Sequence, residues 1–469
     1  MKPSDYSLND PIAAIATGLV PAALGIVRTS GKRCIELLAP LFSRRSALLS
    51  APGNSLVHGW MIEPASGQKI DEVMLAVYRA PKSFTGEDSV EIIGHGGPSA
   101  VLAVYRLLVS AGFRAAERGE FSFRSFANGK TDLTRAEAVR EIIDARTDTA
   151  RAHAADRLSG TLTAEITRIK DLILTTLAAI EVEIEYPEDE ETTAGAFDSR
   201  RLEEARDQLI KLESSWAAER LYRDGARVVL AGRTNAGKSS LFNMLLKEER
   251  AIVSDIHGTT RDWLESWADF GGIPIRIFDT AGLRETGDLI EAEGVERSRS
   301  LAGGADLVFY LVDAADGLND DDHAFLSGGE GNNTGSHRIP VILVWNKADK
   351  ADARPIPQAA AVSAAAACAV SAKKGTGIAD LVQKATEILL GDRPRGERTA
   401  GLGTERQKTA VRTALSFLTH ALTAARDGFP MDAIAQDLED ALAALGEITG
   451  EISSADVLDA VFSGFCVGK

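Results

Sequence analysis

The chain has 469 residues, with 52 Lys and Arg against 68 Asp and Glu, a formal net charge of -16. This length exceeds what one hydrophobic core usually serves, so we expect about two to four domains. The acidic balance argues against a protein that coats nucleic acid non-specifically, so any RNA contact must be local. Three cysteines without a CxxC pair exclude a disulfide framework and a cysteine-based zinc cluster, and they suit a reducing compartment.

Residues 11–27 are almost entirely apolar and begin close to the N-terminus, as the core of a secretion signal does. Two aspartates precede this run, and glycine and proline residues interrupt it, so a buried strand with a tight turn is favoured. No other stretch approaches the ~18 to 20 apolar residues that a membrane helix needs. We therefore expect a cytoplasmic protein with no membrane partner.

Up to about residue 125 the apolar pattern is short and alternating, which is typical of a small α+β domain. We expect strands at 23–29, 73–78 and 90–94, with a helix at 100–110. Two polar clusters, 83–97 and 118–134, would by themselves be turns and helix caps.

Helical spacing of apolar residues then runs from 134 to 185, with a break expected near Gly160, and again from about 198 to 223. It returns near the C-terminus, at 405–426 and 431–448. Each helical stretch has an apolar stripe to bury, so the two halves are natural partners. The sequence therefore predicts a discontinuous all-α helical domain into which another domain is inserted.

The inserted segment alternates strands and helices, which predicts a mainly parallel α/β sheet. Its strands are expected to begin with the one that starts at residue 226 and to continue at 273–278, 307–312, 341–345 and 367–370. The expected domains are 1–125 (α+β), 126–224 (helical, first part), 225–392 (α/β) and 393–469 (helical, second part).

Residues 227–243 have the pattern of a strand, a glycine-rich loop and a helix. The spacing of Gly232, four residues and then Gly237-Lys238-Ser239 is the phosphate-loop signature. Loop N–H groups and the helix N-terminus would surround phosphates, Lys238 would reach the β and γ phosphates, and the Ser239 hydroxyl would bind Mg²⁺. An ordinary βα turn is the less favoured alternative. We assign nucleotide contacts to Asn235, Ala236, Gly237, Lys238, Ser239 and Ser240.

Two further motifs follow predicted strands, where an open α/β sheet binds its ligand. In DTAG (279–282), Asp279 would hold a water on Mg²⁺, and the Gly282 N–H would approach the γ phosphate. In NKAD (346–349), the Asp349 carboxylate can accept two hydrogen bonds from guanine, whereas adenine offers neither donor. Each motif alone could be a surface turn, but their order behind a phosphate loop favours GTP. The remaining base contacts are assigned to Asn346, Lys347, Ser371 and Ala372.

Residues 254–262 lie between the phosphate loop and DTAG and supply a threonine as second Mg²⁺ ligand and γ-phosphate sensor; we choose Thr260. Ras-like proteins place a water-orienting Gln directly after the DTAG glycine, and this chain has Leu283. Another polar group must therefore orient the water. The alternative is that the charged residues that follow Leu283 are only solvated charges on a helix. The residues alone rank Arg284, Glu285, Asp288, Glu291 and Glu293 equally.

Taken together, GRTNAGKSS, SDIHGTTRD, DTAGLRE, NKAD and the terminal FCVGK resemble the tRNA-modification GTPase family MnmE, also called TrmE. SFTGED, GHGGP, GEFS and the stretch 128–138 are similar to that family's N-terminal domain and following helix. The resemblance covers essentially the whole chain. It implies a homodimer that works with the FAD-dependent protein MnmG (GidA) to modify carbon 5 of the wobble uridine in certain tRNAs.

The resemblance also implies particular site residues. A tetrahydrofolate derivative, 5-formyl or 5,10-methylene, would contact Arg28, Glu91, Lys130 and Lys469. Potassium would bind at Asn235, Ser254, Ile256 and Thr259, where it could neutralise charge in the transition state as an arginine finger does. The family's water-positioning glutamate falls on Glu291, and its tail cysteine falls on Cys466, which could equally be a packed small apolar residue.

Two other classes of function compete with a modification enzyme. One is a regulatory GTPase that binds RNA or ribosomal particles without covalent chemistry, and the other is a scaffold in which bound nucleotide is structural. The N-terminal domain and the FCVGK tail favour the modification enzyme, because an assembly GTPase has no use for a folate pocket.

Overall fold

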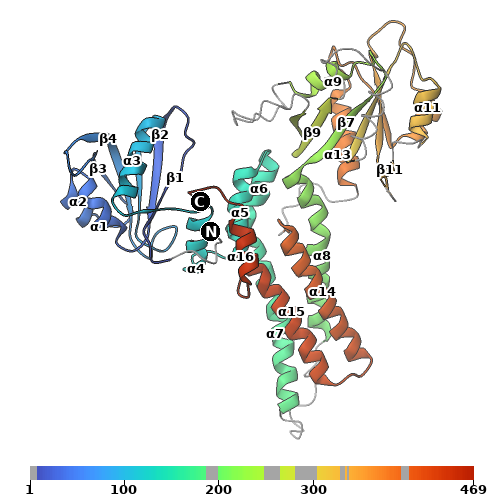
Figure 1. The fold of residues 1–469 in the computed structure, drawn as a ribbon. Helices are drawn as coiled ribbons and strands as arrows, with labels where there is room; N and C mark the ends of the chain where they lie inside the picture. The colour runs from blue at the N-terminus through green and yellow to red at the C-terminus, as the bar shows by residue number, and fades with distance from the viewer. Residues whose placement is uncertain are drawn as a thin grey trace. The chain divides into compact units, whose positions relative to one another are not determined.

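The computed structural model describes residues 8–185, 199–247, 265–279, 304–327, 333–334, 337–391 and 401–468. The chain divides into two compact units. One unit contains Met1–Arg140, Thr163–Arg206 and Ala410–Lys469, and the other contains Glu141–Leu162 and Asp207–Thr409. The predicted fold class is confirmed: an α+β N-terminal domain, a discontinuous helical domain and an inserted α/β P-loop domain (Figure 1).

The N-terminal domain is built on a six-stranded sheet in the order β3-β4-β5-β2-β1-β6. Its buried face packs against α3 (Pro98–Ser110), because alternate apolar residues such as Val27, Val90 and Ile92 point to that side. The opposite face carries Arg28 of β2 directly across from Glu91 of β5. The strands are β1 (Ile12–Ile15), β2 (Ala22–Ser30), β3 (Ser55–Ile62), β4 (Lys69–Tyr78), β5 (Ser89–Gly96) and β6 (Arg114–Ala115).

The apolar run at 11–27 forms the antiparallel pair β1–β2, which confirms the prediction of a buried strand and a turn. The prediction of turns at 118–134 is wrong, because this cluster contains α4 (Glu120–Ala127) and the start of α5 (Leu133–Asp144). Gly119 precedes α4 with φ 70, and the side chain of Phe121 is 1 % exposed. Burial of aromatic side chains therefore outweighs the polar composition. Short helices near the N-terminus are α1 (Cys34–Leu38), η2 (Ala39–Leu41) and α2 (Arg45–Ser50).

The predicted helical region after residue 133 consists of three helices rather than two. The break at Gly160 is confirmed, and a second break precedes α6, where Thr147 caps the helix by accepting a hydrogen bond from Ala150 N. The long helices α7, α14 and α15 lie side by side (Figure 1), and Lys170 of α7 pairs with Glu451 just beyond α15. The bounds are α6 (Asp148–Ser159), α7 (Thr161–Glu185), α8 (Ser199–Asp224), α14 (Glu405–Arg426), α15 (Met431–Thr449) and α16 (Ala455–Phe462).

The inserted domain has a second six-stranded sheet, in the order β14-β13-β10-β7-β9-β8. All neighbouring strands are parallel except the β8–β9 hairpin. Its strands are β7 (Ala226–Gly232), β8 (Glu265–Phe270), β9 (Ile273–Asp279), β10 (Leu307–Asp313), β13 (Val341–Asn346) and β14 (Ala366–Ala369). A short pair, β11 (Asn333–Thr334) and β12 (His337–Arg338), accompanies α9 (Lys238–Leu245), α11 (Asp320–Leu326), α12 (Gln358–Ser363) and α13 (Ile378–Leu390).

The β8–β9 hairpin contacts α6 closely. The Thr147 hydroxyl donates a buried hydrogen bond of 2.7 Å to the Gly272 carbonyl, and the Arg146 guanidinium lies 4.1 Å from the centre of the Trp267 ring. Gly272 has φ +94, and a Cβ there would lie 2.2 Å from the Thr149 hydroxyl oxygen, so only glycine fits. Residues 141–162 therefore belong with the inserted domain in one compact unit. No helix in the described part of the chain is both long and apolar enough to span a membrane.

Candidate functional site

The phosphate loop follows β7, the strand between β10 and β9. The loop needs glycine at both ends because the chain approaches its neighbours closely there. A Cβ on Gly232 would lie 2.3 Å from the Leu311 carbonyl oxygen. A Cβ on Gly237 would lie 2.2 Å from Asn346 Nδ2. Both glycines also have positive φ, +129 and +96. The sequence therefore closes the loop tightly against the neighbouring strand and leads directly into the N-terminus of α9.

Lys238, the first residue of α9, folds back over the loop. Its ammonium group donates to the carbonyl oxygens of Gly232 at 2.7 Å and Arg233 at 2.8 Å. Asn235 adopts φ 63, and its side chain and that of Ser239 are exposed beside the helix N-terminus. Exposed amide and hydroxyl oxygens are suitable ligands for hard cations, and the helix N-terminus favours an anion. These positions fit the predicted phosphate, Mg²⁺ and K⁺ contacts of the loop.

Asn346 ties the NKAD motif to the phosphate loop. This side chain is 1 % exposed; its amide nitrogen donates to the Ala236 carbonyl at 2.8 Å, and its amide oxygen accepts from Ala372 N at 3.1 Å. Lys347 donates to the Asn235 carbonyl at 2.7 Å. The structure thus joins Asn346 to the phosphate loop, 110 positions earlier at Ala236, and to Ala372, 26 positions later.

The Asp349 carboxylate is oriented by the segment 371–374. The Ser371 hydroxyl donates to Asp349 Oδ1 at 2.7 Å, and the Lys374 ammonium lies 3.7 Å from Oδ2. The hydrogen bond from Ser371 lowers the pKa of Asp349, so the group is a carboxylate at neutral pH. A fixed carboxylate at this place is the acceptor that guanine recognition needs.

Asp313, at the end of β10, is a site residue that the sequence analysis missed. Its Oδ2 accepts from Lys347 at 2.7 Å and from Lys350 at 3.2 Å. Burial by itself would raise the pKa of Asp313. Hydrogen bonds from Lys347, Ala315 N and Lys350 outweigh this effect and lower the pKa to about 2. Asp313 therefore holds Lys347 in place. Its position at a strand end, like that of Asp279 and Asn346, is the signal that could have indicated it.

Several predicted residues lie outside the described residues, so they remain predictions. Asp279 is described only as the last residue of β9, whose backbone pairs with Leu230 of β7. Among the described residues, no cluster of three or more His, Cys, Asp or Glu could hold a metal. The predictions outside the described ranges are Ser254, Ile256, Thr259, Thr260, Gly282, Glu291 and Lys469.

A second candidate site surrounds Arg28 on the face of the N-terminal sheet opposite α3. Its Nε lies 3.0 Å from a Glu91 carboxylate oxygen, and its Nη1 donates to the Gly468 carbonyl at 3.0 Å. The guanidinium lies between two aromatic rings, 5.2 Å from the centre of Phe84 and 5.1 Å from that of Phe121. The sequence analysis assigned no role to either phenylalanine, although Phe84 lies in SFTGED and Phe121 lies in GEFS. Arg28 and Glu91, two of the predicted folate contacts, are adjacent, and their contact with folate remains a prediction.

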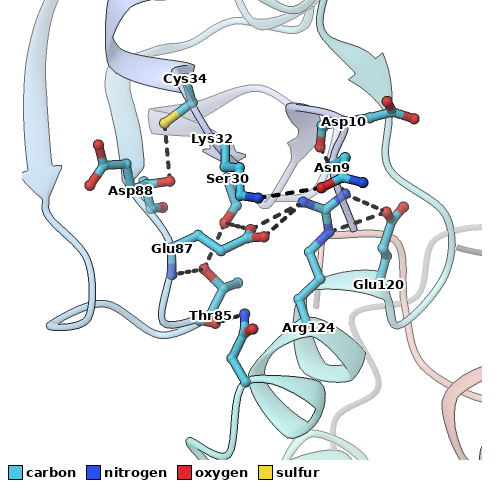
Figure 2. A network of polar contacts seen from close by, with 12 residues as sticks. Asn9, Asp10, Ser30, Lys32, Cys34, Thr85, Glu87, Asp88, Glu120 and Arg124 are labelled. Atoms are coloured by element: carbon cyan, nitrogen blue, oxygen red, sulfur yellow. Dashed lines mark hydrogen bonds and ion pairs between the residues drawn. The ribbon is translucent and has the colours of Figure 1, made fainter. Parts of the chain in front are cut away.

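A buried polar network fixes the loop that carries Phe84 (Figure 2). Arg124, whose side chain is 0 % exposed, pairs with Glu87 at 3.1 Å and with Glu120 at 3.0 Å, and donates to the Asp10 carbonyl at 2.9 Å. The Ser30 hydroxyl lies 2.6 Å from that of Thr85 and donates to Glu87 at 2.8 Å. Because all these charges are paired, the network is a stable support for the face that carries Arg28.

The C-terminal tail reaches the same face. Phe462 and Phe465 pack with Leu133 and neighbouring side chains, and Val467 bridges to Arg118. The side chain of Cys466 is exposed, which contradicts the alternative that this cysteine is a packed small apolar residue. Lys130 is also exposed. It lies next to Gly86, because a Cβ added to Gly86 would be 3.2 Å from the Lys130 Cγ. Of the predicted folate contacts, Arg28 therefore touches the described end of the tail, and Lys130 lies beside the loop that carries Phe84.

Comparisons with known proteins match the whole chain. A family model described as "MnmE helical domain" matches residues 133–466, and one described as "GTP-binding protein TrmE N-terminus" matches residues 11–130. A protein of Treponema denticola named "tRNA modification GTPase MnmE" is 53% identical, with 100% of both chains covered. One of the same name from Treponema pallidum is 45% identical, again over 100% of both. A crystal structure of Era from Aquifex aeolicus bound to GDP·AlF4⁻ has a TM-score of 0.26 and 22% identity, covering 41% of this chain and 66% of that one.

Proposed function

The chain belongs to the MnmE family, and from that premise we propose that it hydrolyses GTP as one subunit of a tRNA-modification enzyme. The observation that carries the proposal is the joining of NKAD to the phosphate loop through Asn346 and Lys347. In the proposed function, the Asp349 carboxylate would select guanine and the nearby N-terminus of α9 would bind the phosphates.

For the hydrolysis itself, Lys238 would leave its two carbonyl partners and pair with the β and γ phosphates. Ser239 and Thr260 would hold Mg²⁺, with Asp279 binding one of its waters, and the ion supplies charge neutralisation when bound. The Gly282 N–H would donate to the γ phosphate, and Glu291 would orient the attacking water. Potassium held by Asn235, Ser254, Ile256 and Thr259 would place a second positive charge near the phosphates.

GTP hydrolysis is expected to be much faster in K⁺ than in Na⁺, because the Asn235 side chain is exposed beside the helix N-terminus. An arginine finger in other GTPases raises kcat by on the order of 10³-fold or more, and the rate increase caused by K⁺ should not exceed the effect of such a finger. Phosphate release is measured in the two chloride salts at matched ionic strength, with Asn235→Ala as the variant and Thr234→Ala as its neighbouring control. Equal native rates in both salts would remove the potassium assignment.

We further propose that the N-terminal region 1–125 binds a tetrahydrofolate derivative, 5-formyl or 5,10-methylene, and forms the homodimer. Arg28, Glu91, Lys130 and Lys469 would contact it, and the partly exposed Glu91 carboxylate suits the amino and ring N–H groups of a pterin. When bound, the folate supplies the one-carbon unit. The helical parts 126–224 and 393–469 would flank the GTPase domain 225–392, in a cytoplasmic complex with tRNA and the FAD-dependent MnmG.

Cells that lack this protein are expected to contain tRNA without the carbon 5 substituent on the wobble uridine. Nucleoside mass spectrometry measures the loss, and a plasmid copy of the native chain should restore the modification. A Lys238→Ala copy should not restore it, because the phosphate charge would be unpaired. Unchanged wobble uridines in the deletion strain would favour a regulatory GTPase that binds RNA or ribosomal particles.

A further inference from the structure

We propose that Arg233, the second residue of the phosphate loop, is a positioning residue that acts through a buried anchor formed by Asp322 and Tyr310. The inference rests on the proposed hydrolysis of GTP and adds a role to a side chain outside the predicted nucleotide contacts. Its basis is a set of contacts between the phosphate loop and the segment from β10 to α11.

The anchor begins with the two ends of the Arg233 guanidinium. Nη2 donates to the Gly317 carbonyl at 2.6 Å, and Nε lies 3.3 Å from Asp322 Oδ2. Both acceptors belong to the segment that connects β10 to α11 and begins that helix. A planar guanidinium spans a carbonyl and a carboxylate with fixed geometry, which the single ammonium of lysine cannot do.

Asp322 is a rigid attachment point because every part of it is held. The side chain is 0 % exposed, Oδ1 accepts from the Tyr310 hydroxyl at 2.7 Å, and Oδ2 accepts from Asn319 N at 2.9 Å in the capping box of α11. A buried carboxylate requires such partners, and the Arg233 cation supplies the opposite charge.

Tyr310 connects this attachment point to the sheet beneath the loop. It lies on β10 opposite Ala231, the penultimate residue of β7, and its ring stacks on Phe325 of α11 with centroids 4.4 Å apart. Burial and the contact with Asp322 raise the pKa of the Tyr310 hydroxyl, so it stays protonated and remains a donor. The anchor is therefore attached to β10, the strand that pairs with β7, and β7 leads into the phosphate loop.

The main chain of Arg233 carries the anchor's effect into the site. Its carbonyl accepts from the Lys238 ammonium at 2.8 Å and from Ala236 N at 3.4 Å. The far end of the loop is held by Asn346 and Lys347. Arg233 holds the near end, so the two attachments together set where Asn235 and Lys238 are presented to phosphates.

The test compares Arg233→Ala with Arg354→Ala in the full chain. Arg354 reaches the Asp316 carbonyl, 3.5 Å away, in the same connecting segment, but its contact is with that segment rather than with the loop. Displacement of reacting groups by about 1 Å costs on the order of 10²-fold, so Arg233→Ala should lower kcat/KM for GTP by roughly tenfold to hundredfold. Arg354→Ala should stay close to native, and Arg233→Lys should recover little.

A purely structural role would lower the Tm without a specific kinetic change. We therefore also expect the effects of Arg233→Ala and Asp322→Asn on kcat/KM to be non-additive, since each breaks the same pair. If Arg233→Ala does not fold, Tyr310→Phe, which keeps the ring, should show a smaller loss of kcat/KM than Asp322→Asn. Native kinetics in folded Arg233→Ala, or in Tyr310→Phe and Asp322→Asn together, would overturn the inference. Absence of GTP hydrolysis by the native chain would instead overturn the proposed function.

Discussion

Asp349→Asn is expected to lose affinity for GTP by on the order of 100-fold or more. The native carboxylate, held by Ser371, can accept from both the ring N–H and the amino group of guanine. An asparagine amide can accept only one of these bonds and turns an N–H donor toward the other. The dissociation constant of a fluorescent GTP analogue, measured by equilibrium titration, reports the change directly.

The same substitution should improve binding of xanthosine triphosphate, whose second carbonyl can accept from the new amide. Asp352→Asn is the matched control, because this carboxylate is exposed three residues further along the chain. It should leave both affinities close to native. Native GTP affinity in Asp349→Asn would contradict the assignment of NKAD as the base-recognition motif.

Glu291→Ala is expected to keep GTP binding and to lose hydrolysis by roughly 10²- to 10⁴-fold, the range of a positioned general base or water-orienting group. The reason is Leu283, which stands where Ras-like proteins have a Gln and cannot orient water. Single-turnover phosphate release separates this chemical step from binding.

Glu293→Ala serves as the control, since the residues alone gave it the same rank as Glu291. Its turnover should stay near the native value, as expected for a solvated charge. If Glu293→Ala rather than Glu291→Ala stops hydrolysis, the water is oriented by a neighbour and the resemblance has been carried over to the wrong residue.

The nucleotide site was predictable because its motifs are contiguous in sequence and each follows a strand. Gly232 and Gly237 alone indicate the loop, and their close contacts with Leu311 and Asn346 agree with that prediction. The partners of Arg233 and Lys347 were not predictable from local patterns. The parallel pairing of β7 with β10 brings Asp322 near Arg233, and that of β10 with β13 brings Asp313 near Lys347.

Long separation also explains what was missed in the N-terminal domain. The Gly468 carbonyl accepts from Arg28 across 440 positions, and periodicity carries no information on such a contact. The turn prediction at 118–134 failed for a different reason. Its polar residues include Glu120 and Arg124, which are buried as an ion pair within α4. Composition alone predicts that such charged residues are exposed to solvent.

The hydrogen bond between Thr147 and Gly272 has a consequence for cooperative unfolding. It is buried at both ends, so α6 cannot detach from the β8–β9 hairpin without leaving the Gly272 carbonyl unpaired. Amide protons of α6 should therefore exchange with solvent together with those of the hairpin rather than with those of α7. A fragment cut at residue 225 would lose that protection along with the contact of Arg146 on Trp267.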